Sequence, residues 1–68
     1  MKKLISFDDI AQNSKEQGLD GAINLAFPGC SDVQKEGLIG VGFGTVVIDG
    51  EAWDWILKAD HYLFIIAE

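Results

Sequence analysis

The clearest structural pattern in the chain is LIGVGFGTVVI, Leu38–Ile48, followed directly by Asp49-Gly50. Asp-Gly is a favoured two-residue loop for a β-hairpin, because a type I′ turn needs positive φ at both central positions. The residues just before the turn, Thr45–Ile48, are β-branched, which suits a pleated strand. The sequence therefore predicts a hairpin whose first strand is Leu38–Ile48.

Folding the chain about this turn predicts a definite register. The expected cross-strand pairs are Ile48 with Glu51, Val46 with Trp53, Gly44 with Trp55, and Gly42 with Leu57. Because side chains alternate with a period of two, Gly40, Gly42 and Gly44 fall on one face. Trp55 and Leu57 lie opposite two of these glycines and can cover the bare backbone. The matched spacing of glycines and large apolar residues is the most specific pattern in the chain.

A helix over residues 50–60 is the alternative for the second strand. Asp49 would cap it, Glu51 would lie near its positive end, and Asp54 with Lys58 would form an i,i+4 ion pair. Apolar groups would then surround most of this helix, namely Trp53, Trp55, Ile56 and Leu57. We therefore favour the hairpin, followed by a turn near residues 58–60 and a final strand over His61–Ala67.

The N-terminal half predicts helical structure. Ser6 is a good N-cap, with Asp8 and Asp9 in the positive first turn, so we expect a helix from Phe7 to about Gln17, ended by Gly18. Its expected inward stripe is Phe7, Ile10, Ala11 and Ser14.

Three shorter segments are less clearly defined by their sequence. Leu4-Ile5 is read as a brief edge strand or as core anchors. Residues 22–27 fit a second helix, capped by Asp20-Gly21, and a strand equally well. Ser31–Gln34 has the form of a capping box, which predicts a single helical turn ending at Gly37.

Together these elements predict one small α+β domain over residues 1–68. An N-terminal helix, with or without a second short helix, packs on a C-terminal three-stranded antiparallel β-meander. One face of the sheet carries Ile39, Val41, Phe43, Val47 and Ile56, and the other carries Leu38, Val46, Ile48, Trp53, Trp55 and Leu57. The N-terminal half is long enough to cover one of these faces well. An uncovered apolar face marks a protein interface, so we expect a partner or a homodimer.

Composition limits the classes of partner. The chain has 68 residues, a net charge of −6, and eleven acidic groups against five lysines. An acidic surface disfavours direct binding to nucleic acid, whose backbone is polyanionic, and favours a protein partner with a basic surface. A single cysteine leaves no disulfide within the chain, no apolar run is long enough for a membrane span, and no signal peptide is visible. We therefore expect a cytoplasmic protein without membrane contact.

No pattern predicts a catalytic residue, a cofactor or a metal ligand. Gly40–Val46 is similar to the glycine-rich loop of protein kinases, but it is one residue short and the other kinase motifs have no room here. Cys30 and His61 are the sole cysteine and histidine, and a nucleophile–base pair would also need a positioning group and an oxyanion site. Zinc needs three or four such ligands. The acidic residues near Asp49 do not follow EF-hand spacing.

The acidic residues form three sets in the sequence: Asp8, Asp9 and Glu16; Asp32 and Glu36; and Asp49, Glu51 and Asp54. The last set has no lysine nearer in sequence than Lys58, so we predict it as the partner-binding group, with the first set as the alternative. Mutual repulsion should make its members poor stabilisers of the fold. Trp53 lies between them and is read either as an interface anchor or as part of the core.

In size, acidity and lack of catalytic groups, the chain resembles the very small acidic inhibitors made by phages and mobile elements, such as anti-CRISPR proteins that mimic DNA. This resemblance implies a stoichiometric inhibitor that blocks a basic, nucleic-acid-binding partner by occlusion. The alternative is a small structural or regulatory subunit that self-associates through its apolar sheet face. An enzyme using Cys30 and His61 is the least favoured hypothesis.

Overall fold

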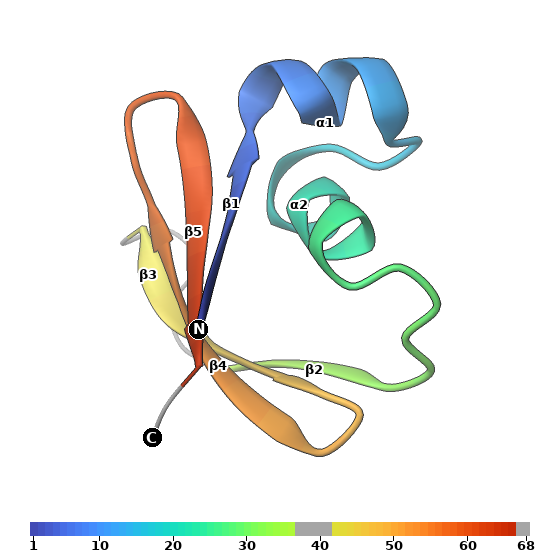
Figure 1. Cartoon of the computed structure of the whole chain (residues 1–68), viewed down its shortest axis with the longest axis vertical. Coiled ribbons are helices and arrows are strands. Elements are labelled where there is room, and N and C mark those ends of the chain that lie inside the picture. Colours follow the sequence, from blue (N-terminus) through green and yellow to red (C-terminus); the bar gives the residue numbers. More distant parts are fainter. Residues whose placement is uncertain (37–41, 67–68) are drawn as a thin grey trace.

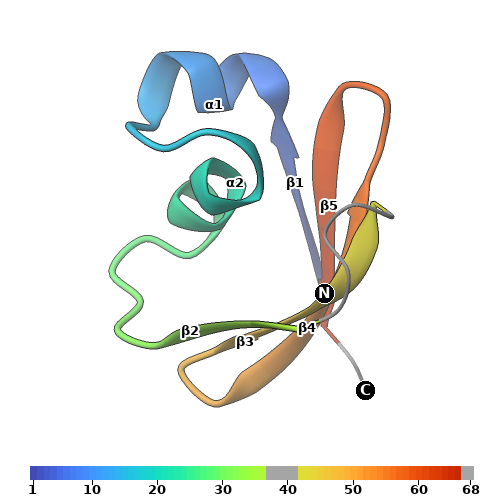
Figure 2. The same ribbon diagram turned by 180° about the vertical axis from the view of Figure 1, so that it is seen from behind.

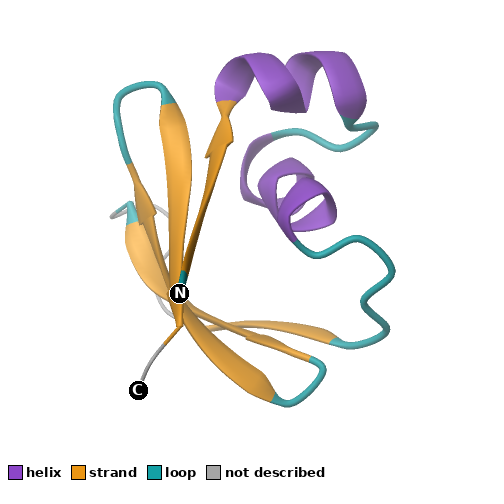
Figure 3. Ribbon diagram, in the orientation of Figure 1, coloured by secondary structure: helices purple, strands orange, loops and turns teal. Residues whose placement is uncertain are grey.

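The computed structural model describes residues 1–36 and 42–66, and within them it has the predicted α+β class (Figures 1 and 3). The elements in chain order are β1 (Lys2–Ser6), α1 (Phe7–Asn13), α2 (Gly18–Ala26), β2 (Val33–Glu36), β3 (Phe43–Ile48), β4 (Glu51–Leu57) and β5 (His61–Ile66).

The strands form one antiparallel sheet in the order β1-β5-β4-β3-β2. The predicted meander is its centre, β3-β4-β5. The prediction of a three-stranded sheet is too small, because β1 adds beside β5 and β2 adds beside β3. Both additions pair backbone groups that a three-stranded sheet would leave open at its edges.

The hairpin has the predicted turn and register. Asp49 and Gly50 both have positive φ, at 49° and 87°, as a type I′ turn requires. Gly44 pairs with Trp55, and the Leu57 amide donates to the Gly42 carbonyl at 2.7 Å. The helix alternative for residues 50–60 is therefore wrong. The first part of the predicted strand, with Leu38, Ile39, Gly40 and Val41, lies outside the described residues.

The first helix begins as predicted and ends earlier. The Ser6 hydroxyl accepts from the Asp9 amide at 3.1 Å, which caps α1. The helix stops at Asn13 rather than near Gln17, because Ser14 is extended and its hydroxyl accepts from the Glu16 amide at 3.2 Å. Within the predicted inward stripe, Ile10 is the residue that α1 buries.

The second segment is a helix, α2, and it starts at Gly18 rather than Ala22. Its buried residues follow helical spacing: Leu19, Ala22, Ile23 and Ala26. Gly21 lies where the preceding chain crosses α2. A Cβ there would be 2.6 Å from the Glu16 carbonyl oxygen and 2.7 Å from Ile10 Cγ2, so only glycine permits this close approach.

The helical turn predicted from Ser31–Gln34 is wrong, because this segment leads into β2. The hairpin turn binds the backbone groups that a helical turn would use. Asp49 Oδ1 accepts from the amides of Ser31 and Asp32 at 2.9 and 2.7 Å. The Asp49 amide donates to the Asp32 carbonyl at 2.9 Å. A tertiary contact thus overrides the local capping pattern.

The two helices lie beside the same face of the sheet, as the opposite views in Figures 1 and 2 show. We call this the covered face. Its buried strand residues are Val46, Ile48, Trp53, Trp55, Tyr62 and Phe64. Phe27, at the end of α2, completes the core by packing edge-on against Trp53 and Phe64, with ring centroids 5.0 and 5.4 Å apart.

Replacing Gly44 with valine should destabilise the domain. A Cβ at this position would lie 2.7 Å from the Glu36 carbonyl oxygen and 2.9 Å from Trp55 Nε1, so the indole or β2 must move. We expect a loss of about 1–3 kcal/mol in the free energy of unfolding, measured by denaturant titration. Thr45→Val, one residue along the same strand and on the opposite face, is the matched control. Equal stability of Gly44→Val and wild type would contradict the register.

Candidate functional site

Three acidic residues surround the β3–β4 turn, and two of them are held in place by hydrogen bonds. Asp49 accepts from the amides of Ser31 and Asp32, which places Asp32 beside it. Glu51 Oε1 accepts from Trp53 Nε1 at 3.1 Å. All three acidic residues are exposed. We call Asp32, Asp49 and Glu51 the hairpin pole.

This group differs from the predicted one at one position. Asp54 does not join Asp49 and Glu51, because strand alternation places it on the opposite face of β4 from Glu51. There it accepts from the Thr45 hydroxyl at 3.4 Å. Asp32, which the sequence groups with Glu36, takes its place. Asp32 and Asp49 are 17 residues apart in the sequence, and the hydrogen bond from the Asp32 amide to Asp49 Oδ1 brings them together. Local sequence therefore could not indicate that they are neighbours.

Neutral donors hold two of the three carboxylates of the hairpin pole, those of Asp49 and Glu51. Among the described residues the ion pairs are Lys35–Asp20 at 2.6 Å and His61–Asp60 at 2.7 Å, and neither includes a pole carboxylate. Lys3 lines the same hollow as Asp49, but its ammonium lies over the Phe27 ring, 5.4 Å from the centroid. The expectation that these carboxylates are poor stabilisers of the fold rests on their mutual repulsion, whereas Asp49 also accepts hydrogen bonds from two backbone amides.

Trp53 belongs to the core. Its exposed fraction is 3%, and its ring packs against Phe27. The register explains this position, because Trp53 pairs with Val46, which is fully buried on the covered face. Of the two readings of Trp53, the core reading is the one observed, and its indole supports the hairpin pole through Glu51.

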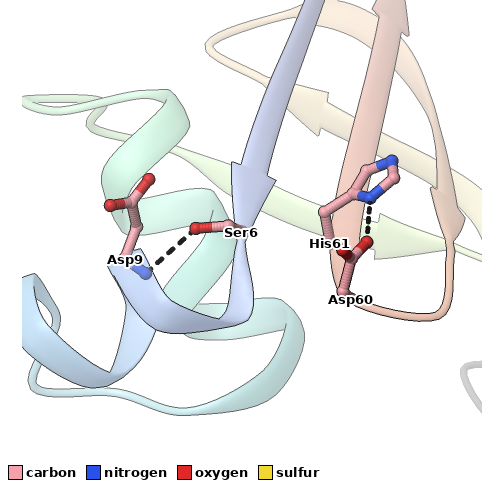
Figure 4. A network of polar contacts seen from close by, with 4 residues as sticks. All are labelled: Ser6, Asp9, Asp60 and His61. Carbon is pink, nitrogen blue, oxygen red and sulfur yellow. Dashed lines mark hydrogen bonds and ion pairs between the residues drawn. The ribbon is translucent and has the colours of Figure 1, made fainter.

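The alternative acidic set lies at the other end of the molecule. Asp8 and Asp9 occupy the first turn of α1. The Phe7 amide donates to the Asp60 carbonyl at 2.9 Å, which joins this turn to the β4–β5 turn. Figure 4 shows Asp9 beside its cap Ser6, and Asp60 beside His61. Asp60 therefore joins Asp8 and Asp9 at this acidic end. Glu16 lies in the loop after α1, because the helix ends at Asn13.

Cys30 and His61 are not brought together. Cys30 lines a hollow with Asp49 at the hairpin end, whereas His61 follows the β4–β5 turn, where its Nδ1 is 2.7 Å from Asp60 Oδ1. The β3–β4 turn and the β4–β5 turn lie at opposite ends of the sheet (Figure 1). A nucleophile–base pair between Cys30 and His61 does not form in this arrangement. Within residues 1–36 and 42–66, no group of three or more His, Cys, Asp or Glu is placed to hold a metal ion.

No described helix covers the second face of the sheet, which we call the outer face. Four apolar residues lie in register across four of its strands: Leu4, Leu63, Ile56 and Phe43. Leu4 and Phe43 are 58% and 61% exposed. An apolar row open to solvent is typical of a protein interface. The sequence indicated Phe43 and Ile56, but it could not place Leu4 and Leu63, because their faces follow from the pairing of β1 with β5.

A second row crosses the outer face beside the first, and it carries charge. Its residues are Lys2, Ile65, Asp54, Thr45 and Glu36, each paired with the next across the sheet. A shallow hollow opens between the two rows on β3 and β4, lined by Phe43, Thr45, Asp54 and Ile56.

A further hollow lies between α1 and β5. Phe7, Ile10, Ala11, Gln17, Gly18 and Tyr62 line it. Burial raises the pKa of the Tyr62 hydroxyl above its usual value. The walls are mainly apolar, so this hollow offers little that would orient a polar ligand.

Comparison with known proteins gives no relative: no family model, curated protein or solved structure matches this chain. In the described part of the chain, neither helix has the length and apolar character that a membrane crossing needs.

Removing the Asp49 carboxylate should destabilise the fold more than neutralising it. Asp49→Ala loses both hydrogen bonds and places alanine at positive φ, so we expect a loss of about 1–2 kcal/mol in the free energy of unfolding. Asp49→Asn keeps an acceptor oxygen and tolerates this φ, so its loss should be smaller. Glu16→Ala is the control for removing an exposed carboxylate. Thermal unfolding of the three variants makes the comparison, and equal melting of Asp49→Ala and Glu16→Ala would contradict the structural role of Asp49.

Proposed function

We propose that this chain is a non-catalytic binding protein that inhibits a partner by occupying its basic, nucleic-acid-binding surface. The hairpin pole is the surface that makes the contact. Partner lysines and arginines that normally hold phosphates would instead meet the carboxylates of Asp32, Asp49 and Glu51.

The supporting observation is that carboxylates at this pole are fixed without being neutralised. Asp49 is held by two backbone amides and Glu51 by an indole N–H, so their negative charge stays available. A side chain that is already ordered loses less conformational entropy when it binds. The fixed, exposed negative charges of Asp49 and Glu51 complement the positive charges of a phosphate-binding surface.

The rest of the chain adds long-range attraction. Its net charge of −6 draws it toward a basic surface and raises the association rate at low salt. Asp8, Asp9 and Asp60 lie at the opposite end from the hairpin pole, so the two groups do not form one compact contact surface. The α1 end contributes to steering and is the alternative contact surface.

A second candidate function is that of a self-associating structural or regulatory subunit. The exposed apolar row of the outer face supports it. Its geometry is compatible with the first function, because the outer face and the hairpin pole use different residues.

Affinity capture with a nucleic-acid competitor tests the proposal. The chain is immobilised, exposed to an extract of its native host, and washed at low salt, and the retained proteins are identified by mass. We expect a basic, nucleic-acid-binding protein that added duplex or single-stranded nucleic acid releases. Retention of proteins that nucleic acid does not release would overturn the proposal.

Neutralising the hairpin pole should weaken this binding specifically. The variant combines Asp32→Asn, Asp49→Asn and Glu51→Gln, and the control combines Asp8→Asn, Asp9→Asn and Glu16→Gln, so both lose the same charge. We expect the pole variant to bind the captured partner at least about tenfold more weakly, with a flatter dependence on salt. The control should change affinity much less. Equal affinities and salt slopes for the two variants would remove the hairpin pole from the mechanism.

A further inference from the structure

The outer face differs in shape between its β1 side and its β3–β4 side. On the β1 side, Leu4 is 58% exposed and stands at the end of the apolar row. On the β3–β4 side, the shallow hollow is lined by Phe43, Thr45, Asp54 and Ile56. Three strand spacings separate Leu4 from Phe43, which is roughly 14 Å. Both ends of the apolar row are therefore exposed, and the β3–β4 half also carries a hollow beside Phe43 in which a side chain can lie.

The two halves also differ in charge. In the second row, Lys2 lies at the β1 end, whereas Asp54 and Glu36 lie on β4 and β2. Lys2, Asp54 and Glu36 are all exposed. None of them is in an ion pair among the described residues. A uniformly basic partner surface laid over the outer face would be repelled by Lys2, and a uniformly acidic one would be repelled by Asp54 and Glu36. A surface that carries the same two halves in reverse order places opposite charges against all three residues.

A second copy of this chain presents those halves in reverse order. A two-fold axis parallel to the strands, between β5 and β4, inverts the strand order of the facing sheet. Leu4 then lies opposite Phe43 of the second copy, and Leu63 lies opposite Ile56 of the second copy. Lys2 lies opposite Thr45 of the second copy, with the Asp54 and Glu36 carboxylates of that copy on either side.

We propose that the outer face is a homodimer interface with this two-fold arrangement. Leu4 and Lys2 of each copy enter the hollow of the other, where Phe43 and Ile56 receive the leucine and Asp54 faces the ammonium. The two sheets pack face to face in the aligned manner, about 10 Å apart. An isologous contact of this kind is the commonest way in which soluble chains dimerise.

The axis direction has a consequence for the acidic surface. Because the axis runs parallel to the strands, both β3–β4 turns lie at the same end of the dimer. The two hairpin poles are then presented side by side, so the dimer offers twice the carboxylates to a partner. The dimer itself does not depend on the proposed function, since the interface omits Asp32, Asp49 and Glu51.

Sedimentation equilibrium from micromolar to millimolar concentration tests the apolar contact. We expect the wild type to dimerise with rising concentration, and Leu4→Ser and Phe43→Ser to remain monomeric while keeping their fold, because both side chains are exposed. Val33→Ser is the matched control. Val33 is also an exposed apolar residue, at 38%, but it pairs with Ile48 and so lies on the covered-face side of β2. A wild type that stays monomeric throughout, or a dimer that tolerates both serine variants, would overturn the proposal.

Charge reversal tests the two-fold arrangement. Lys2→Glu faces carboxylates of the second copy and Asp54→Lys faces its lysine, so each should raise the dimer dissociation constant by about tenfold. The variant carrying both changes restores opposite charges across the interface and should dimerise nearly as the wild type does. Lys15→Glu, in the loop after α1, makes the same charge change as Lys2→Glu away from the interface and should leave the dimer intact. Losses that add in the combined variant would contradict this arrangement.

Discussion

The close approach of Trp55 to Gly44 holds β3 and β4 in a single register. The indole is 1% exposed and lies against the glycine backbone, with the Tyr62 ring 6.2 Å away on the next strand. A side chain at Gly44 would occupy the space of the indole. A slip of one residue would bring Asp54 and Ile56 to the covered face and Trp53 and Trp55 to solvent. The contact therefore fixes which residues are buried and which remain outside.

The surfaces assigned to binding follow from that division. The alternation that buries Trp53 and Trp55 places Asp54 and Ile56 on the outer face, beside Phe43. The turn that sets the register also carries Asp49, whose carboxylate fastens the chain leading into β2. The same residue thus stabilises the fold and supplies negative charge at the hairpin pole. In a small domain, few residues are available, and Asp49 therefore serves both the fold and the proposed contact surface.

Sequence predicted the parts of the fold that local chemistry determines. The Asp49-Gly50 turn, the Ser6 cap and the central meander depend on neighbouring residues, and they are present as expected. The pairing of β1 with β5 was missed in part because it joins the two ends of the chain. The strand β2 was missed because its first residues carry a helical capping pattern. The capping pattern at Ser31 failed because its amide is bound by Asp49, 18 residues away. The predicted acidic group contained Asp54 where the structure has Asp32. Sequence could not indicate Asp32, because its proximity to Asp49 is a tertiary contact.

Solvent accessibility of individual methyl groups tests the division into a covered and an outer face most directly. The measurement is nuclear magnetic relaxation by a water-soluble paramagnetic agent, in a methyl-labelled sample dilute enough to be monomeric. We expect strong relaxation at Leu4, Leu63 and Ile56, and shielding at Ile23, Val46 and Ile48. Shielding of Leu4 and Leu63 in the dilute monomer, or strong relaxation at Val46 and Ile48, would contradict it.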